Sequence, residues 1–523
     1  MIKSAITHNS YSNYAFPVSK NKLKLRLKTA KNDLKEVKVI YGNRFVFDDS
    51  EPSKIKKMKL KASSLNNDFY ETIIELKDPR FRYHFLLNDG KNKYWFNEKG
   101  FFKNRPRGYK SGFFQYSLIT NDDLIERPKW LDDAIIYQIF PERFNNSDDS
   151  ISPDNLEKWG EIPERNSFFG GDLKGIYEKL DYIDKFGVNV IYLTPIFQSP
   201  TNHKYNIDDY MKIDEHFGDK EIFKKLVNEA HKRNIKIILD AVFNHSGYNF
   251  FAFEDLRKKG ANSDYKDWYI YDDLPLKTDV PVNYETFARN IPDLPKLDTS
   301  NKEVQNYLLE VTEYWTQNFA IDGWRLDVAD EVEPSFWKKF RNKVKSINKD
   351  AYIIGEVWHS GKKWLQGDQF DSIMNYSFTE AVIDFIAKDK IGPEEFNSRL
   401  TLNRMNYKEV ITYSLLNLLD SHDTARLLHY CKGNKKKLKL AILFQMTYVG
   451  IPMVLYGDEL GLTGGDDPDN RRCMPWDDEK VDYSLKDFYK KLIEIRKHSS
   501  ILQKGQFESF IINEAKNIYA FKR

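Results

Sequence analysis

Cysteine is scarce in this chain, whose 523 residues include only two, Cys431 and Cys473. Two cysteines are too few for a disulfide framework or a structural zinc site, so we expect both to be free thiols. Long apolar runs are absent as well: no stretch approaches the roughly 18 residues of a membrane-spanning helix, and residues 1–20 lack the core of a secretory signal. The sequence therefore predicts a cytoplasmic protein, although a secreted protein that has already lost its signal would look the same.

Excess charge of one sign is also lacking. The 81 Lys and Arg residues against 78 Asp and Glu residues give a net charge of +3, and the two signs are interspersed. The sequence therefore lacks the large basic face that would indicate nucleic acid as a partner. The longest basic-rich stretch, Lys54 to Lys61, is more typical of a solvated surface. Apolar and ring surface is abundant, with 41% hydrophobic and 15% aromatic residues, which predicts a folded protein with a large core.

Residues 1–126 carry short alternating runs such as Leu23 to Leu27 and Val37 to Tyr41, separated by Asn, Asp, Gly and Pro. A period of two indicates antiparallel strands with one solvated face, and we expect a small β-sandwich. The segment from Arg127 to Lys129 is then a linker.

From Trp130 onward, apolar strand-like runs alternate with amphipathic helical segments, a pattern typical of βα units around a parallel sheet. Eight strands are predicted, at residues 135–140, 188–193, 235–242, 323–328, 352–357, 372–378, 415–419 and 451–456. Helices are predicted at residues 220–234, 301–319, 333–348, 435–449 and 485–498. Eight such units close into an α/β TIM barrel, (β/α)8, over residues 127–498.

Two further segments depart from this pattern. Residues 246–300 are too long for an ordinary loop and predict an inserted lid subdomain after the third strand. Residues 499–523 contain two predicted strands, 507–512 and 517–521, which are barely a domain by themselves. We expect a truncated C-terminal β segment, or a tail that leans on another domain.

Ionisable residues gather where the predicted barrel strands end, which is the working face of such barrels. Arg325 and Asp327 alternate on one strand and should face the same side, where the guanidinium can hold the carboxylate ionised as a nucleophile. Glu356 follows an apolar run whose low dielectric favours the protonated carboxyl and suits it to deliver a proton. Asp423, beside His422, offers a third carboxylate for sugar hydroxyls and a positively charged transition state. This combination is what glycosidic bond cleavage requires.

Each of these residues taken alone has a plainer interpretation. A lone Asp at a strand end is more often a helix cap or an ion-pair partner, and a lone His is more often a satisfied polar residue than a catalyst. Together they favour an active site, because independent structural needs would not place carboxylates, Arg and His at so many strand ends.

These residues fall in motifs that resemble the α-amylase family of retaining glycoside hydrolases, glycoside hydrolase family 13, from about Trp130 to the end. Four principal motifs match in order: DAVFNH (240–245), GWRLDVADE (323–331), GEVWH (355–359) and LLDSHD (418–423). The resemblance implies that Asp327 is the nucleophile, Glu356 the general acid and base, and Asp423 the transition-state stabiliser. It also implies sugar binding at the cleavage point by Asp240, His245, Arg325, His422 and Tyr205, the last by stacking on the ring.

The N-terminal β-domain, the Glu-Val-Trp-His motif and the loop at residues 464–472 resemble the neopullulanase, cyclomaltodextrinase and maltogenic amylase group. The resemblance implies a cytoplasmic enzyme that cleaves α-1,4 bonds of cyclodextrins, pullulan and short maltooligosaccharides, with some transglycosylation, and a homodimer. Residues 1–126 would be carbohydrate-binding-like. Trp358 and His359 would lie on the leaving-group side, and Asp467 and Arg471 at the non-reducing end of the substrate.

A structural calcium site is also implied, with oxygen donors from Asn146, Asp148, Gly170 and Asp172. The matching stretch has Ile151 and Ser152 where the group carries side-chain donors of calcium, which prefers six to eight oxygens, so a weak water-completed site and no site are both compatible with the sequence. No cofactor is required for the chemistry.

Three alternatives stay open. The first is an α-1,6-glucosidase or a transglycosylating isomerase on the same barrel. The second is a catalytically inactive carbohydrate-binding protein, which the presence of all three carboxylates and Arg325 disfavours. The third is a metal-dependent hydrolase, which the absence of paired His spacing disfavours.

Overall fold

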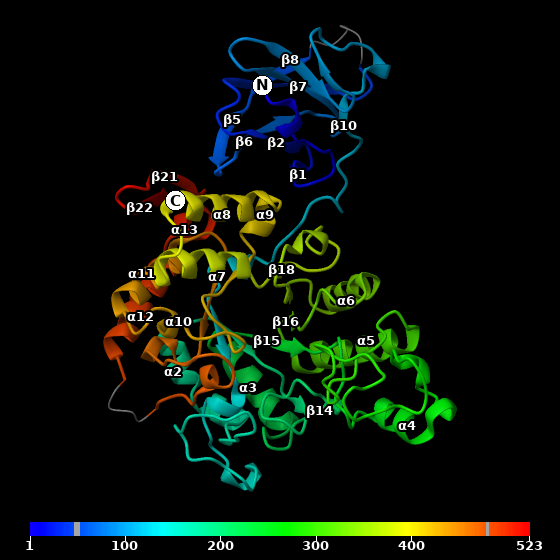
Figure 1. Cartoon of the computed structure of the whole chain (residues 1–523), viewed down its shortest axis with the longest axis vertical. Helices are drawn as coiled ribbons and strands as arrows, with labels where there is room; N and C mark the ends of the chain where they lie inside the picture. The colour runs from blue at the N-terminus through cyan, green and yellow to red at the C-terminus, as the bar shows by residue number, and fades with distance from the viewer. Residues whose placement is uncertain (47–52, 477–480) are drawn as a thin grey trace. The chain divides into compact units, whose positions relative to one another are not determined.

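The computed structural model describes residues 1–46, 53–476 and 481–523, coloured by residue number in Figure 1. They form two compact units. The first comprises residues 1–126, 389–412 and 506–523, and the second comprises residues 127–388 and 413–505.

The first unit is built on two antiparallel sheets, as the alternating runs predict. One sheet has the order β1 (Ala15–Ser19), β2 (Lys22–Ala30), β6 (Asn67–Glu75), β5 (Lys59–Ser63). The other has the order β4 (Lys54–Lys57), β3 (Glu36–Asn43), β7 (Phe81–Asn88), β8 (Lys93–Asn97), β9 (Gly100–Phe102), with β10 (Phe114–Tyr116) paired to β7. Alternate residues of β2 and β3 enter a common core, including Leu23, Leu25, Leu27, Val37 and Val39.

The prediction that one face of each strand is solvated is wrong for β2. Lys24 and Arg26, on the face opposite the core, are buried. The Arg26 guanidinium donates from Nη1 to the carbonyls of Met405 (2.7 Å) and Tyr407 (3.2 Å), and Lys24 pairs with Glu409. Residues distant in sequence therefore cover this face, which alternation along a single strand cannot indicate.

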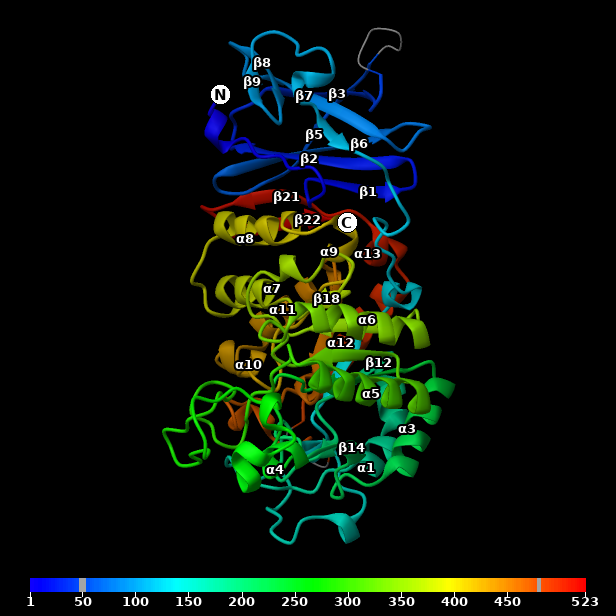
Figure 2. The ribbon, with the colours of Figure 1, turned by 90° about the vertical axis from the view of Figure 1, so that its right-hand side faces the viewer.

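The C-terminal tail forms the two predicted strands as a hairpin, β21 (Glu508–Asn513) and β22 (Ile518–Lys522). It lies beside α8 (Pro393–Met405), which is followed by α9 (Glu409–Thr412) (Figure 2). The rings of Phe396 on α8 and Tyr519 on β22 meet edge to face, with their centroids 5.0 Å apart. The tail thus packs within the first unit.

The second unit is the predicted barrel of eight parallel strands. Their order is β18 (Ser372–Ile373), β17 (Tyr352–Gly355), β16 (Gly323–Leu326), β15 (Lys236–Ala241), β12 (Val190–Leu193), β11 (Ile136–Ile139), β20 (Ile451–Leu455), β19 (Leu416–Asn417). A parallel bridge between Met374 and Leu416 joins the two ends of this order and closes the barrel. An apolar cluster fills part of the interior, with Ile136, Val190 and Ile238 among its buried residues.

The sixth predicted strand, 372–378, is wrong in its second half. Strand β18 ends at Ile373, and Tyr376–Val382 is a helix, α7. The Asn375 backbone N–H donates to the Leu416 carbonyl at 2.8 Å, after which the Phe378 N–H bonds back to Asn375 and the chain coils. A buried apolar run of this length does not distinguish helix from strand by its pattern.

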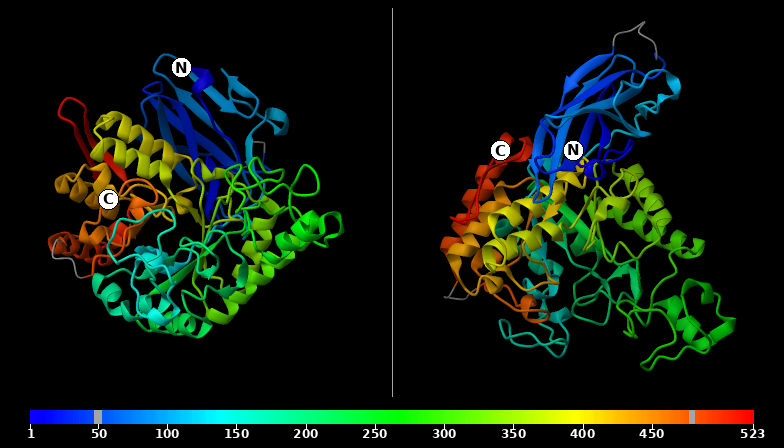
Figure 3. Two further views of the ribbon diagram at one scale, coloured as in Figure 1. Left: turned by 60° about the horizontal axis from the view of Figure 1, so that its bottom comes forward. Right: turned by 45° about the horizontal axis from the view of Figure 1, so that its top comes forward.

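The helices of this unit surround the strands (Figure 3). They are α1 (Leu173–Glu178), α2 (Leu180–Phe186), α3 (Lys220–Lys232), α5 (Lys302–Phe319), α6 (Pro334–Ile347), α7, α10 (Leu427–Tyr430), α11 (Lys435–Thr447), α12 (Tyr483–Lys497) and α13 (Ser500–Lys504). The five predicted helices correspond to α3, α5, α6, α11 and α12. Asp219, Asn301 and Asn434 cap the first turns of α3, α5 and α11 through their side chains, which fixes where these helices begin.

The segment at residues 246–300 contains α4 (Phe251–Lys259) and an aromatic cluster in which Phe250, Phe251 and Trp268 meet Tyr307 of α5. A short hairpin, β13 (Phe197–Gln198) with β14 (Asp209–Ile213), follows strand β12. None of the helices in the described ranges has the length and apolar character needed to cross a membrane.

Candidate active site

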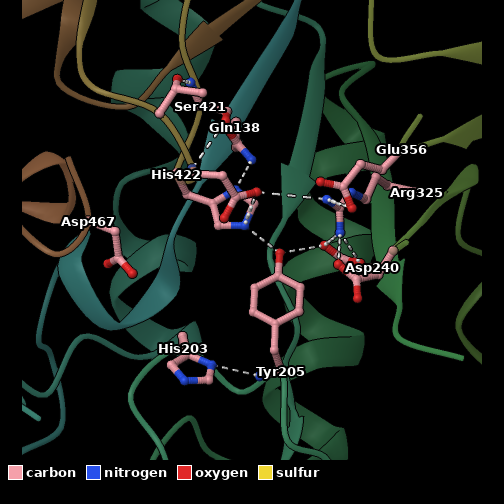
Figure 4. A network of polar contacts seen from close by, with 12 residues as sticks. Gln138, His203, Tyr205, Asp240, Arg325, Glu356, Ser421, His422 and Asp467 are labelled. Carbon is pink, nitrogen blue, oxygen red and sulfur yellow. Dashed lines mark hydrogen bonds and ion pairs between the residues drawn. The ribbon is translucent and has the colours of Figure 1, made fainter. Parts of the chain in front are cut away.

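One buried guanidinium organises the carboxylates at the ends of three neighbouring strands (Figure 4). Arg325 on β16 donates from Nη1 to both oxygens of Asp240 on β15 (3.0 and 3.1 Å) and to Asp327 Oδ1 (2.7 Å). Its Nη2 lies 2.8 Å from Glu356 Oε2, directly after β17. Asp327 and Glu356 therefore contact the same guanidinium, and Arg325 is itself only 1% exposed.

Glu356 is held at both carboxyl oxygens. The Trp358 indole donates from Nε1 to Oε1 at 3.1 Å, and the backbone N–H of Val328 donates to Oε2 at 2.9 Å. Val328 has φ = +44°, a region that β-branched residues rarely adopt, so the chain is strained directly after Asp327. This conformation aims the Val328 N–H at the carboxyl group that is expected to move the proton.

Asp423 lies in the turn that follows β19, with its side chain partly exposed. Its Oδ2 is 3.2 Å from His422 Nε2 and 3.9 Å from Arg325 Nη2, and its Oδ1 accepts from Arg471 Nη2 at 3.3 Å. The third carboxylate is therefore close to the same guanidinium but belongs to a different loop.

Tyr205, His422 and Asp240, which the family resemblance assigns to sugar binding, are linked to one another (Figure 4). The Tyr205 hydroxyl donates to Asp240 Oδ2 at 3.0 Å, and its ring lies parallel to that of His422, with centroids 5.4 Å apart. Gln138 donates to His422 Nδ1 at 2.8 Å, which leaves the imidazole proton on Nε2, toward Asp423 and Tyr205. His245 reaches the Tyr205 carbonyl at 3.1 Å.

Burial dominates the titration of this cluster. It raises the pKa of Asp240 to about 6 and the pKa of Asp327 well above its usual range, where the charges of Glu356 and Asp240 add to the rise and Arg325 opposes it. The expected ionising effect of Arg325 on Asp327 is therefore outweighed, because one guanidinium is shared among several carboxylates away from water. Burial lowers the pKa of His245 to about 3 and the pKa of His422 well below its usual range, so both rings are neutral.

The amino-acid sequence matches known protein families along nearly the whole chain. A family profile described as "Alpha amylase, catalytic domain" matches residues 138–505, and one described as "Alpha amylase, N-terminal ig-like domain" matches residues 1–120. This chain belongs to the α-amylase family. The resemblance drawn from the sequence motifs is confirmed.

Relatives within the α-amylase family cover the chain end to end. A cyclomaltodextrinase of Thermoanaerobacter pseudethanolicus is 48% identical over 523 residues, covering 100% of this chain and 90% of the relative. Neopullulanase 2 of Thermoactinomyces vulgaris is 46% identical over 526 residues, covering 100% and 89%. A solved cyclomaltodextrinase structure superposes with a TM-score of 0.96 at 42% identity, covering 100% of this chain and 89% of that one.

Four residues that the α-amylase family resemblance assigns to substrate lie around this centre. Trp358 is 50% exposed and stacks on Tyr376 with centroids 3.8 Å apart, while His359 points to Asp330 at 2.9 Å. Arg471 Nη1 pairs with Asp467 at 3.0 Å. His359 and Asp467 are not brought to the Arg325 guanidinium, and the substrate roles of all four residues stay predictions.

The oxygen donors that the α-amylase family resemblance implies for calcium are partly engaged in other contacts, so they fit the ion only in part. Asp172 caps α1, accepting at 2.5 to 2.9 Å from the backbone N–H groups of Gly175, Ser147 and Asp148. Asp148 Oδ2 faces Lys174 Nζ at 3.5 Å. Among the described residues, Asn146 Oδ1 is a buried oxygen without a hydrogen bond, and a side chain at Gly170 would meet Asn146 and Ser152. Calcium therefore stays a prediction, and no step proposed for the reaction depends on it.

Sequence reasoning missed Gln138 and Tyr192, which hold His422 and Asp240 from inside the barrel. Tyr192 on β12 donates to Asp240 Oδ2 at 2.6 Å, and Gln138 on β11 orients His422. The available signal was a polar residue, Gln138, inside the otherwise apolar run of β11. Tyr192 gave no such signal, because a tyrosine in a buried strand is ordinary.

Proposed function

We propose that the chain is a retaining α-glycoside hydrolase that cleaves α-1,4-glucosidic bonds of cyclodextrins, pullulan and short maltooligosaccharides, with some transglycosylation. The observation that carries the proposal is the contact of one guanidinium with both Asp327 and Glu356 at the carboxyl end of the barrel. Two carboxyl groups that contact one guanidinium are compatible with the separation of about 5 Å typical of retaining enzymes.

In the proposed reaction, Glu356 protonates the glycosidic oxygen while Asp327 attacks the anomeric carbon, and the departing sugar carries the proton away. Positive charge developing on the ring is stabilised by the side chains of Asp327 and Asp423. Glu356, now a carboxylate, then takes a proton from water as the water oxygen attacks the anomeric carbon and releases Asp327. A sugar hydroxyl in place of water gives transglycosylation.

The substrate range is tested by incubating the enzyme with β-cyclodextrin, pullulan and starch in parallel and separating the products. We expect ring opening of cyclodextrin and release of panose from pullulan, because only cleavage of α-1,4 bonds leaves the α-1,6 bond inside a trisaccharide. Maltotriose from pullulan would instead identify an α-1,6-glucosidase. The relatives support the first outcome, since they include a cyclomaltodextrinase and a neopullulanase. Sugar binding without new reducing ends would indicate the inactive carbohydrate-binding protein.

An intracellular homodimer is part of the proposal. The location is supported by a Bacillus subtilis relative named intracellular maltogenic amylase, 39% identical over 525 residues, and the dimer by the family resemblance. Light scattering during gel filtration should give twice the chain mass of 61.9 kDa, whereas a single chain mass would contradict the dimer.

Removing the charge of Asp240 should move the acidic limb of the kcat/KM profile. The Asp240 charge helps to raise the pKa of Asp327, so Asp240→Asn should lower that pKa. Asp327 then stays ionised at more acidic pH, and the acidic limb of the profile should move to lower pH. At the optimum, kcat/KM should fall about 10- to 100-fold, since hydrogen bonds to a charged group are worth roughly 1.5–3 kcal/mol. A limb that stays in place would show that Asp240 does not influence the nucleophile.

Chelation should leave the chemistry intact. We expect EGTA to leave kcat on β-cyclodextrin unchanged, because the proposed steps use side chains alone, and a melting curve recorded beside it reports any structural calcium. Loss of kcat that added calcium restores, with the fold retained, would contradict a metal-free reaction.

A further inference from the structure

A single buried amide holds the turn that carries Asp423. Asn470 is 0% exposed and lies after β20, between Pro468 and Arg472. Its Nδ2 donates to the carbonyls of His422 (2.7 Å) and Thr424 (2.9 Å), which flank Asp423 on both sides, and lies 3.4 Å from the Ser421 carbonyl. Three carbonyls facing one nitrogen require a donor at this position.

The neighbouring residue completes the contact with the same turn. Arg471 donates from Nε to the His422 carbonyl at 2.7 Å and from Nη2 to Asp423 Oδ1 at 3.3 Å. Asn470 therefore fixes the main chain around Asp423, while Arg471 contacts its carboxylate. A turn held on both sides of one residue has little freedom to change the direction of that side chain.

Asn470 is itself anchored to the barrel. The buried Arg426 donates from Nε to the Asn470 carbonyl at 2.8 Å, and from Nη1 to the Tyr456 carbonyl (2.8 Å) and Asp458 Oδ1 (2.9 Å), directly after β20. The position of the amide is thus set by a barrel strand rather than by the loop alone, which is the arrangement that precise placement of a reactive group needs.

We infer that Asn470 is a positioning residue for Asp423, acting through the main chain of residues 421–424 and not by touching the sugar. This inference rests on the proposed function, because it takes Asp423 to be the carboxylate that stabilises the positively charged transition state. A carboxylate displaced by about 1 Å costs on the order of 100-fold in rate while substrate binding changes little.

The test replaces the donor by an acceptor of the same shape. Asn470→Asp sets an oxygen against the three carbonyls and should lower kcat on β-cyclodextrin about 100-fold with KM within about threefold of the parent. Affinity for 1-deoxynojirimycin, a cationic sugar analogue, should fall in parallel, whereas affinity for maltose should hold. The matched control is Asp466→Asn, an exposed exchange of the same two side chains in the same loop, which should leave all four quantities unchanged.

Melting curves establish that each variant is folded, and Asn470→Ala, which removes the donor without adding charge, replaces Asn470→Asp if the latter does not fold. A folded variant with unchanged kcat and unchanged affinity for the iminosugar would overturn the inference. Equal losses for maltose and the iminosugar would also overturn it, since they indicate general distortion of the cleft. If the parent enzyme releases no reducing ends, the proposed function fails instead, and the iminosugar titration still decides the role of Asn470.

Discussion

Asp327→Asn is expected to lower kcat on β-cyclodextrin by about 10⁴-fold or more, the scale seen when a covalent nucleophile is removed. The amide cannot attack the anomeric carbon, and no other carboxylate lies where the Asp327 oxygen does. Folding should survive, because Arg325 keeps its contacts with Asp240 and Glu356, and removing one of several crowded carboxylates relieves repulsion. Reducing-end release measures the rate, and a thermal melt measures the fold.

The control for this variant is Asp184→Asn, the same exchange at an exposed position on α2. It should keep the parent rate. A folded Asp327→Asn enzyme that retained a tenth of the parent kcat would show that the glycosyl intermediate forms elsewhere or that the reaction has none.

The barrel could be predicted because its local signals and its global arrangement agree. All eight strands lie within the predicted runs, and caps such as Asp219 and Asn301 stand at the starts of the predicted helices. The prediction failed where burial removes periodicity, as in the run that becomes β18 and α7. It also failed where distant segments decide the environment, as for Lys24 and Arg26 of β2.

The grouping of the carboxylates could be anticipated because ends of parallel strands meet at one edge, so residues after β15, β16 and β17 had to be neighbours. The ionisation of Asp327 could not be anticipated. The sequence prediction paired Arg325 with Asp327 alone and left out Asp240 and Glu356, which contact the same guanidinium. Burial therefore raises the pKa of Asp327, where the prediction expected Arg325 to lower it. Nor does any sequence pattern reveal the positive φ of Val328 or the amide of Asn470 among three carbonyls.

Glu356→Gln should separate substrates by their leaving groups. With cyclodextrin or maltooligosaccharides, the glutamine cannot protonate the departing oxygen, and kcat should fall about 10²- to 10⁴-fold, the usual contribution of general acid catalysis. With α-maltosyl fluoride the leaving group needs no proton, so attack by Asp327 should proceed near the parent rate. The second step then stalls, because water has lost its base.

The expected readout is a burst of fluoride equal to the enzyme concentration, followed by slow turnover, with a maltosyl group on Asp327 detectable by mass spectrometry. The matched control is Glu380→Gln, an exposed exchange on α7, which should show parent rates on both substrates. The amide keeps one acceptor oxygen and sets an NH2 group against either the Trp358 indole or the Val328 N–H, so a thermal melt of each variant accompanies the kinetics. Equal losses on fluoride and on cyclodextrin would remove Glu356 from the proton transfer, because a residue that only shaped the pocket would affect both substrates alike.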